Sequence, residues 1–135
     1  MLEKILRRRK KIQNKKVLIV EDDALLSKVL SENFLNEKFE IVVVDNGLVV
    51  KEKVEQFTPD IILLDLIIPG IDGFAVLKEL KSDKKTAEIP VVVLSNLGDV
   101  GDIKSTKALG AEEYFIKSNT EMSRIVDYVK KRLKI

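Results

Sequence analysis

The sequence predicts a single α/β domain built on a doubly wound, five-stranded parallel sheet. After residue 15, short apolar runs alternate five times with longer amphipathic stretches. This alternation is typical of parallel sheets with right-handed crossovers and helices on both faces. The length of 135 residues, of which 45% are hydrophobic and 34% charged, fits one domain with a buried core. We therefore expect a leader over residues 1–15 and one globular domain over residues 16–135.

The N-terminal segment is strongly basic. Residues 1–16 hold eight Lys or Arg residues against one Glu, whereas the remaining 119 residues are net acidic. Such a tail can attract nucleic acid, anionic lipid or an acidic partner by nonspecific Coulomb forces. No aromatic residue that could stack on bases interleaves its charges. A solvated or loosely helical leader is the plainer interpretation, and nucleic acid is not expected as a partner except through this leader.

The expected strands are runs of branched and aliphatic residues. Ile61 to Leu64 lacks the polar alternation of a half-exposed strand, which indicates a strand buried on both faces. Turn residues in Pro69-Gly70 and Gly73 follow, so the chain leaves the sheet just after Asp65. In chain order, strands are expected at residues 16–20, 39–44, 60–65, 90–95 and 112–116.

Apolar residues at helical spacing follow each strand. Leu25, Val29 and Leu30, for example, fall on one side of the first expected helix. The five helices are expected at residues 24–36, 46–56, 72–82, 99–108 and 119–133.

Composition excludes several classes of chemistry. The chain has no cysteine and no histidine, which removes disulfides, thiol nucleophiles, the usual zinc sites and imidazole acid–base catalysis. Its apolar runs are far shorter than the roughly 20 residues that span a bilayer, and no signal-peptide core is present. A cytoplasmic protein without a membrane span is expected.

Polar side chains follow four of the five expected strands, at the edge where the carboxyl ends of parallel strands meet. They are Glu21, Asp22 and Asp23 after the first strand, Asp65 after the third, Ser95 at the end of the fourth and Lys117 after the fifth. Clustered carboxylates repel unless one is protonated or a cation binds, and Mg²⁺ prefers oxygen ligands. A lysine and a hydroxyl opposite can hold the oxygens of a phosphoryl group.

Each of these residues also has a plainer structural interpretation. Asp65 could serve as a turn or cap residue, the acidic triplet at residues 21–23 could cap the helix that begins at Ala24, Ser95 could be an ordinary strand-end hydroxyl, and Lys117 could be a solvated charge. The convergence of four strands on one edge favours a shared site.

From Lys16 to Ile135 the chain resembles a response-regulator receiver domain of two-component signalling. Gaps of 43, 30 and 52 residues separate Asp65 from Asp22, Ser95 and Lys117, in agreement with the family pattern. The segments "PGIDG" and "ALGAEEYFIKS" are also similar to receiver signatures. The resemblance implies a flavodoxin-like fold with strand order 2-1-3-4-5 and five helices.

The resemblance also implies a function. Asp65 would accept a phosphoryl group from a sensor histidine kinase or a phosphotransfer protein, and Lys117 and Ser95 would hold the phosphoryl oxygens. Ser95 and Tyr114 would form the switch that signals to a downstream protein through the face of the fourth helix, fifth strand and fifth helix. The chain would not be an enzyme beyond phosphoryl transfer to its own aspartate and the hydrolysis of that product.

The implied cofactor is Mg²⁺. By the same resemblance its ligands would be the carboxylates of Glu21, Asp22 and Asp65 and the backbone carbonyl of Ile67.

Two residues depart from the family pattern. Ser118 stands where a proline after a cis peptide bond is usual, and a cis bond before a non-proline residue costs about 2.5–4 kcal/mol. The loop therefore either stores that strain or takes a trans path. Asn96 replaces a small residue and is expected to crowd the phosphoryl pocket or to form a hydrogen bond in it.

Two other function classes remain open. The chain could be a constitutive interaction module that is not phosphorylated. It could also be a small phosphatase or nucleotide-binding protein, but GxxxxGK[ST] and GxGxxG motifs are missing and Ile67 stands where a second aspartate is expected. No DNA-binding domain follows the fifth helix, so the signal is expected to pass by protein contact or phosphorelay, unless the chain is a fragment of a hybrid kinase or larger regulator.

Overall fold

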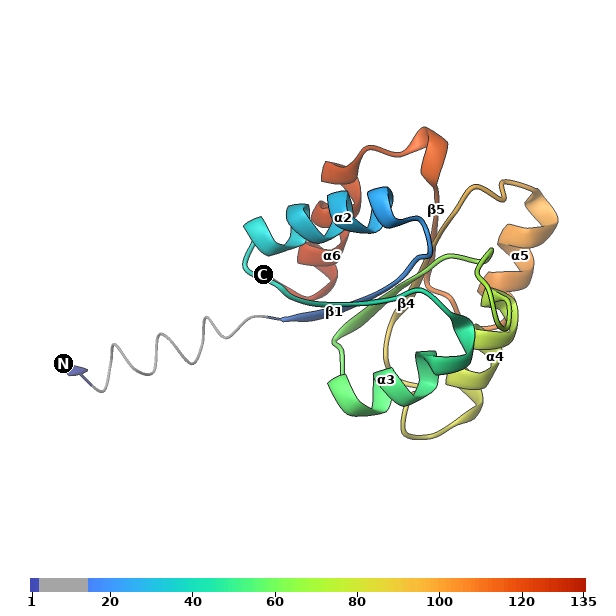
Figure 1. The fold of residues 1–135 in the computed structure, drawn as a ribbon, viewed down its shortest axis with the longest axis horizontal. Helices are drawn as coiled ribbons and strands as arrows, with labels where there is room; N and C mark the ends of the chain where they lie inside the picture. Colours follow the sequence, from blue (N-terminus) through green and yellow to red (C-terminus); the bar gives the residue numbers. More distant parts are fainter. Residues whose placement is uncertain (3–14) are drawn as a thin grey trace.

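The computed structural model describes residues 1–2 and 15–135. The basic leader predicted over residues 1–15 therefore lies almost entirely outside the described residues. From Lys16 onward, strands and helices alternate along the chain (Figure 1).

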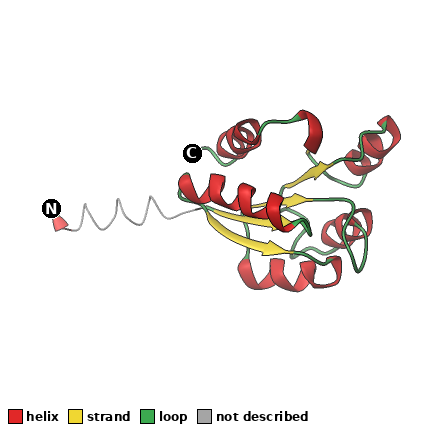
Figure 2. Ribbon diagram, turned by 45° about the horizontal axis from the view of Figure 1, so that its top comes forward, coloured by secondary structure: helices red, strands yellow, loops and turns green. Residues whose placement is uncertain are grey.

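The five strands of the described chain form one parallel sheet, drawn in yellow in Figure 2. Their order across the sheet is β2-β1-β3-β4-β5. They are β1 (Lys16–Val20), β2 (Glu40–Val44), β3 (Ile61–Leu64), β4 (Val91–Ser95) and β5 (Glu113–Ile116). Val20 pairs with both Val44 and Leu64, and Ser95 pairs with Ile116, so these strands end close to one edge. The predicted fold class and strand order are confirmed.

Five α-helices cover the sheet in the described part of the chain. They are α2 (Ala24–Asn36), α3 (Val50–Phe57), α4 (Gly73–Ser82), α5 (Val100–Ala108) and α6 (Met122–Arg132). In Figure 1, α2 and α6 lie on one face of the sheet and α3, α4 and α5 on the other. None of the helices in the described ranges is both long and apolar enough to cross a membrane.

Two expected helices begin differently from the prediction. The helix expected over residues 46–56 is a 3-10 turn, η1 (Gly47–Val49), followed by α3, and Asn46 caps this turn by accepting the Leu48 N–H at 2.9 Å. The helix expected over residues 119–133 begins only at Met122. Residues 117–119 form a separate 3-10 turn, η2 (Lys117–Asn119), and Thr120 is extended, which interrupts the helical path.

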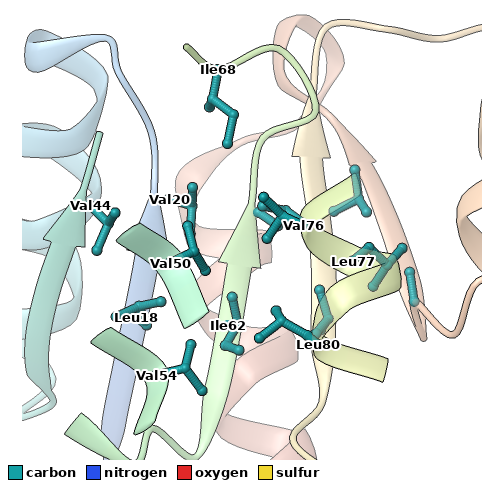
Figure 3. Packing of buried hydrophobic residues seen from close by; sticks show 14 of the residues in the cluster. Leu18, Val20, Val44, Val50, Val54, Ile62, Ile68, Val76, Leu77 and Leu80 are labelled. Atoms are coloured by element: carbon teal, nitrogen blue, oxygen red, sulfur yellow. The ribbon is translucent and has the colours of Figure 1, made fainter. Parts of the chain in front are cut away.

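Side chains of each strand alternate between two apolar clusters, one on each side of the sheet. Leu18 and Val20 of β1 point toward α3, where they lie beside Val50 and Val54 (Figure 3). The opposite face packs against α2 and α6, and Phe34 of α2 meets Phe39 edge to face, with 5.2 Å between ring centroids. Both faces of the sheet are covered, so a ligand site is expected at an edge, outside the carboxyl ends of the strands.

The chain after β3 turns back closely upon itself. The Gly73 N–H donates to the Leu66 carbonyl at 2.9 Å, and a Cβ at Gly73 would lie 2.5 Å from the Asp65 carbonyl oxygen. Only glycine lets α4 begin this close to the segment that carries Asp65.

Candidate functional site

Three carboxylates meet at the carboxyl edge of β1 and β3. One oxygen each from Glu21, Asp22 and Asp65 lies within 4.8 Å of the others. Glu21 and Asp65 are only 3% and 5% exposed, whereas Asp22 is exposed. The pairing of the two strands brings them together, because the Asp65 N–H donates to the Val20 carbonyl at 3.1 Å. The structure thus brings the carboxylates of Glu21, Asp22 and Asp65 close together, as the sequence predicted.

Asp23, the third acidic residue after β1, has a structural role. Asp23 caps α2, since its Oδ1 accepts the N–H groups of Leu25 and Leu26 at 3.0 and 3.1 Å. The alternative that the acidic triplet caps a helix therefore holds for Asp23, while Glu21 and Asp22 contribute carboxylates to the cluster.

Lys117 reaches the cluster from the end of β5, the edge strand that lies two positions from β3 in the sheet. It follows β5, yet its Nζ lies 2.7 Å from Asp65 Oδ2 after β3, and it also forms an ion pair with Glu21 Oε1. Burial lowers the pKa of the Lys117 ammonium, but the contacts with Asp65 and Glu21 more than offset this and raise its pKa above the ordinary value. Lys117 is therefore held as a cation within the site.

Glu21 is a buried carboxylate with one partner for each oxygen. Its Oε2 accepts the Asp23 N–H at 3.2 Å, and its buried Oε1 lies in the ion pair with Lys117. Burial raises the pKa of the Glu21 carboxyl, and Lys117 and the Asp23 N–H only partly oppose the rise. A buried carboxylate beside two others suits a hard divalent cation, which takes oxygen ligands.

A pocket of about 390 Å³ opens over these groups. Its lining residues are Glu21, Asp22, Asp23, Asp65, Ile67, Asn96 and Lys117. The Ile67 side chain is 58% exposed, and its backbone N–H donates to Asp65 Oδ1 at 3.1 Å. Both oxygens of Asp65 are therefore engaged, one by a backbone amide and the other by Lys117.

Ser95 and Tyr114 lie close to the site without lining this pocket. Ser95 is fully buried, and its Oγ accepts the Leu97 N–H at 3.4 Å. The Tyr114 hydroxyl donates to the Leu97 carbonyl, and burial raises the pKa of this phenol. The Ser95 hydroxyl thus lies at the end of β4, at the same edge of the sheet as the pocket, and Leu97 connects it to Tyr114.

The two departures from the receiver pattern are in contact with each other. Asn96 Oδ1 accepts the Ser118 N–H at 3.1 Å. The peptide bond between Lys117 and Ser118 is trans, since no cis bond occurs among the described residues. Sequence reasoning anticipated that Asn96 could bond within the pocket but missed this partner, because no periodic pattern connects residues 22 positions apart.

The chain matches the family described as the response regulator receiver domain over residues 17–130. It is 35% identical over 122 residues to the sporulation initiation phosphotransferase F of Bacillus subtilis, covering 90% of this chain and 96% of that protein. It is 34% identical over 102 residues to the transcriptional regulator RpaA of Synechocystis, covering 76% of this chain but 42% of that regulator. The chain thus spans less than half the length of several curated relatives that it matches.

Solved structures agree with this relationship. A signal receiver domain of a DNA-binding response regulator from Colwellia psychrerythraea is 26% identical, with a TM-score of 0.83 and coverage of 90% of this chain and 100% of that one. The Mn²⁺-bound form of response regulator Rcp1 is 28% identical, with a TM-score of 0.76 and coverage of 86% of this chain and 91% of that one. The chain belongs to the response regulator receiver domain family.

Proposed function

We propose that this chain is a phosphorylation-dependent switch of a two-component or phosphorelay system, with Asp65 as the phosphoacceptor. The observation that carries the proposal is the setting of Asp65. It is a nearly buried carboxylate at the wall of an open pocket, with Lys117 Nζ at 2.7 Å and two further carboxylates beside it. A partly buried ammonium and two acidic neighbours are not required by an aspartate that only forms a turn.

The donor in this proposal is a phosphohistidine of a sensor kinase or phosphotransfer protein. An Asp65 carboxylate oxygen forms the new bond to phosphorus while the bond from phosphorus to the donor imidazole nitrogen breaks, and that nitrogen keeps the electron pair. Lys117 offsets the charge on the phosphoryl oxygens, which its raised pKa favours because the ammonium stays protonated at neutral pH. The Ser95 hydroxyl would hold a second oxygen.

Glu21, Asp22, Asp65 and the backbone carbonyl of Ile67 would hold Mg²⁺. When bound, this ion supplies positive charge that offsets both the carboxylates and the transferring group. Support comes from the closeness of the three carboxylates, two of them nearly buried, and from the all-oxygen donor set. A relative of known structure, Rcp1, has been solved with Mn²⁺ bound.

The readout would pass from Ser95 to Tyr114. Ser95 accepts the Leu97 N–H, and Tyr114 donates to the Leu97 carbonyl. A movement of the Ser95 hydroxyl toward a phosphoryl group would therefore shift Leu97 and, through it, Tyr114. The surface of α5, β5 and α6 would then shift between two existing states, and a downstream protein would bind one of them better. The globular domain over residues 16–135 would suffice for this switch, with residues 1–15 as a basic leader.

The deciding experiment is to incubate the chain with Mg²⁺ and acetyl phosphate and to measure its intact mass. We expect a gain of one phosphoryl group, because the small donor presents the same group as phosphohistidine. The Asp65→Asn variant, which keeps the size of the side chain, is expected to gain nothing. Unmodified wild type, or equal modification of Asp65→Asn, would contradict the proposal, and the first result would favour a constitutive interaction module.

A further inference from the structure

The side chain of Asn96 contacts the backbone of the residue that follows Lys117. In the strand order β3-β4-β5, Lys117 follows β5 and must pass the end of β4 to reach Asp65 after β3. The last paired residues of β4 and β5 are Ser95 and Ile116. Lys117 is thus the first residue beyond the ladder, and its backbone has no strand partner.

Asn96 is the residue directly after Ser95. Its Oδ1 accepts the Ser118 N–H at 3.1 Å, one step past the last ladder pair. The side-chain carbonyl thereby supplies an acceptor where the β4 backbone no longer does. The turn that contains Lys117 has no side-chain cap of its own at Ile116.

We infer that Asn96 is a positioning residue for Lys117, acting through the Ser118 N–H. The inference rests on the proposed role of Lys117 in holding a phosphoryl group on Asp65. With the bond made, the backbone of the turn at residues 117–119 is held against the end of β4, so that the lysine stem starts from a fixed point. Asn96 also lines the pocket, so the bond lies at the site itself.

The bond also gives the two departures from the receiver pattern one explanation. A proline at position 118 has no N–H and could not donate to Asn96. A small residue at position 96 could not accept from Ser118. The hydrogen bond therefore requires both departures at once. The peptide bond between Lys117 and Ser118 is trans.

The test is binding of fluoroberyllate, a phosphoryl mimic, to the full chain saturated with Mg²⁺. Asn96→Ala is expected to weaken this binding about threefold to tenfold, as the loss of one hydrogen bond would. The Kd for Mg²⁺ alone is expected to stay unchanged, because the acidic ligands are untouched. The melting temperature is expected to fall only slightly, because the lost hydrogen bond is exposed and the core is intact. Asn119→Ala is the matched control, since Asn119 is exposed on the same turn and has no side-chain hydrogen bond among the described residues.

A double-mutant cycle tests the path through the Ser118 N–H. In a Ser118→Pro background the donor is gone, so adding Asn96→Ala is expected to weaken fluoroberyllate binding no further. Equal weakening by Asn96→Ala and Asn119→Ala would overturn the inference, as would full additivity in the cycle or a parallel loss of Mg²⁺ affinity. Failure of the wild type to bind fluoroberyllate would instead refute the proposed phosphoacceptor site itself.

Discussion

Gly73 lies so close to the backbone of Asp65 that there is no room for a side chain at this position. A Cβ at this position would lie 2.5 Å from both the Asp65 carbonyl oxygen and the Leu66 Cα. These are backbone atoms, which cannot move aside as the end of a flexible side chain can. We expect Gly73→Ala to lower the free energy of unfolding by about 1–3 kcal/mol, in the range of overpacked sites, as measured by urea denaturation.

Gly101 provides the control for this substitution. It is exposed in the first turn of α5, and a Cβ at this position would have Asp99 Oδ1 as its nearest neighbour, 3.8 Å away. Gly101→Ala is expected to stabilise the chain by about 0.5–1 kcal/mol, because alanine loses less backbone entropy in a helix. Equal effects of the two substitutions would mean that the close approach at Gly73 is not what requires glycine.

Two neighbouring aspartates are expected to separate metal binding from folding. Asp22 is exposed and belongs to the acidic cluster, whereas Asp23 caps α2 through two backbone N–H groups. Asp22→Ala should leave the melting temperature of the metal-free chain nearly unchanged and abolish the rise that millimolar Mg²⁺ produces by linkage. Asp23→Ala should cost about 1 kcal/mol of stability and keep most of that rise. Thermal melts of both variants with and without Mg²⁺ measure the change in stability and the change in the Mg²⁺ response. If Mg²⁺ still raises the melting temperature of Asp22→Ala, Asp22 is not a Mg²⁺ ligand.

Among the five α-helices of the described chain, α5 buries the fewest residues. Within the described chain it buries only Thr106, whereas each of the other four helices buries at least two residues. Few buried contacts permit local opening at low free energy. Hydrogen exchange should therefore be fastest in residues 100–108 among the helices and should slow when fluoroberyllate binds. Strong protection of this segment in the free chain would contradict the expectation.

The attachment of α6 to β5 should give the chain a distinct response to alkaline pH. Tyr128 donates to Glu112 Oε2 at 2.5 Å, and its phenol pKa is raised by burial first and then by this carboxylate. A raised folded-state pKa stabilises the fold fully below the unfolded pKa of about 10 and progressively less as the pH rises above it. The chain has two tyrosines and no tryptophan, so absorbance of tyrosinate reports this ionisation directly.

We expect the tyrosinate signal of the native chain to develop above pH 10 and that of the urea-unfolded chain near pH 10. Tyr128→Phe should lower stability at neutral pH by about 1 kcal/mol through the lost hydrogen bond and should flatten the decline of stability above pH 10. Native and unfolded chains that titrate together would show that the contact with Glu112 does not persist in solution.

At the scale of the whole molecule, the sequence predicted what depends on periodicity and missed what depends on long-range geometry. The alternation of strands and helices follows from the apolar runs, whereas the strand order was implied by the resemblance to receiver domains. The meeting of Asp22, Asp65 and Lys117 follows from polar residues at the ends of these runs, with the family spacing between them. The 3-10 turn at residues 47–49 falls within a predicted helix because its apolar spacing resembles that of an α-helix. The bond between Asn96 and Ser118 joins loops that only the completed sheet brings together.

The division of the chain into leader and domain remains a prediction, and it can be tested on the whole molecule. Every buried apolar residue of the described chain lies at Val17 or beyond. Among the described residues, the first backbone group that bonds to the sheet is the Lys15 carbonyl, which accepts the Glu40 N–H at 2.9 Å. A chain that lacks residues 2–14 keeps both. We therefore expect it to unfold in urea within about 0.5 kcal/mol of the full chain, as surface changes usually do, and to accept a phosphoryl group equally well. Its retention on heparin should fall, because the removed segment carries six of the 24 Lys and Arg residues and one of the 22 acidic ones, and Coulomb attraction to a polyanion depends on such clustered charge. A loss of more than about 1 kcal/mol would exceed the usual effect of a surface change and would mean that the leader belongs to the folded unit.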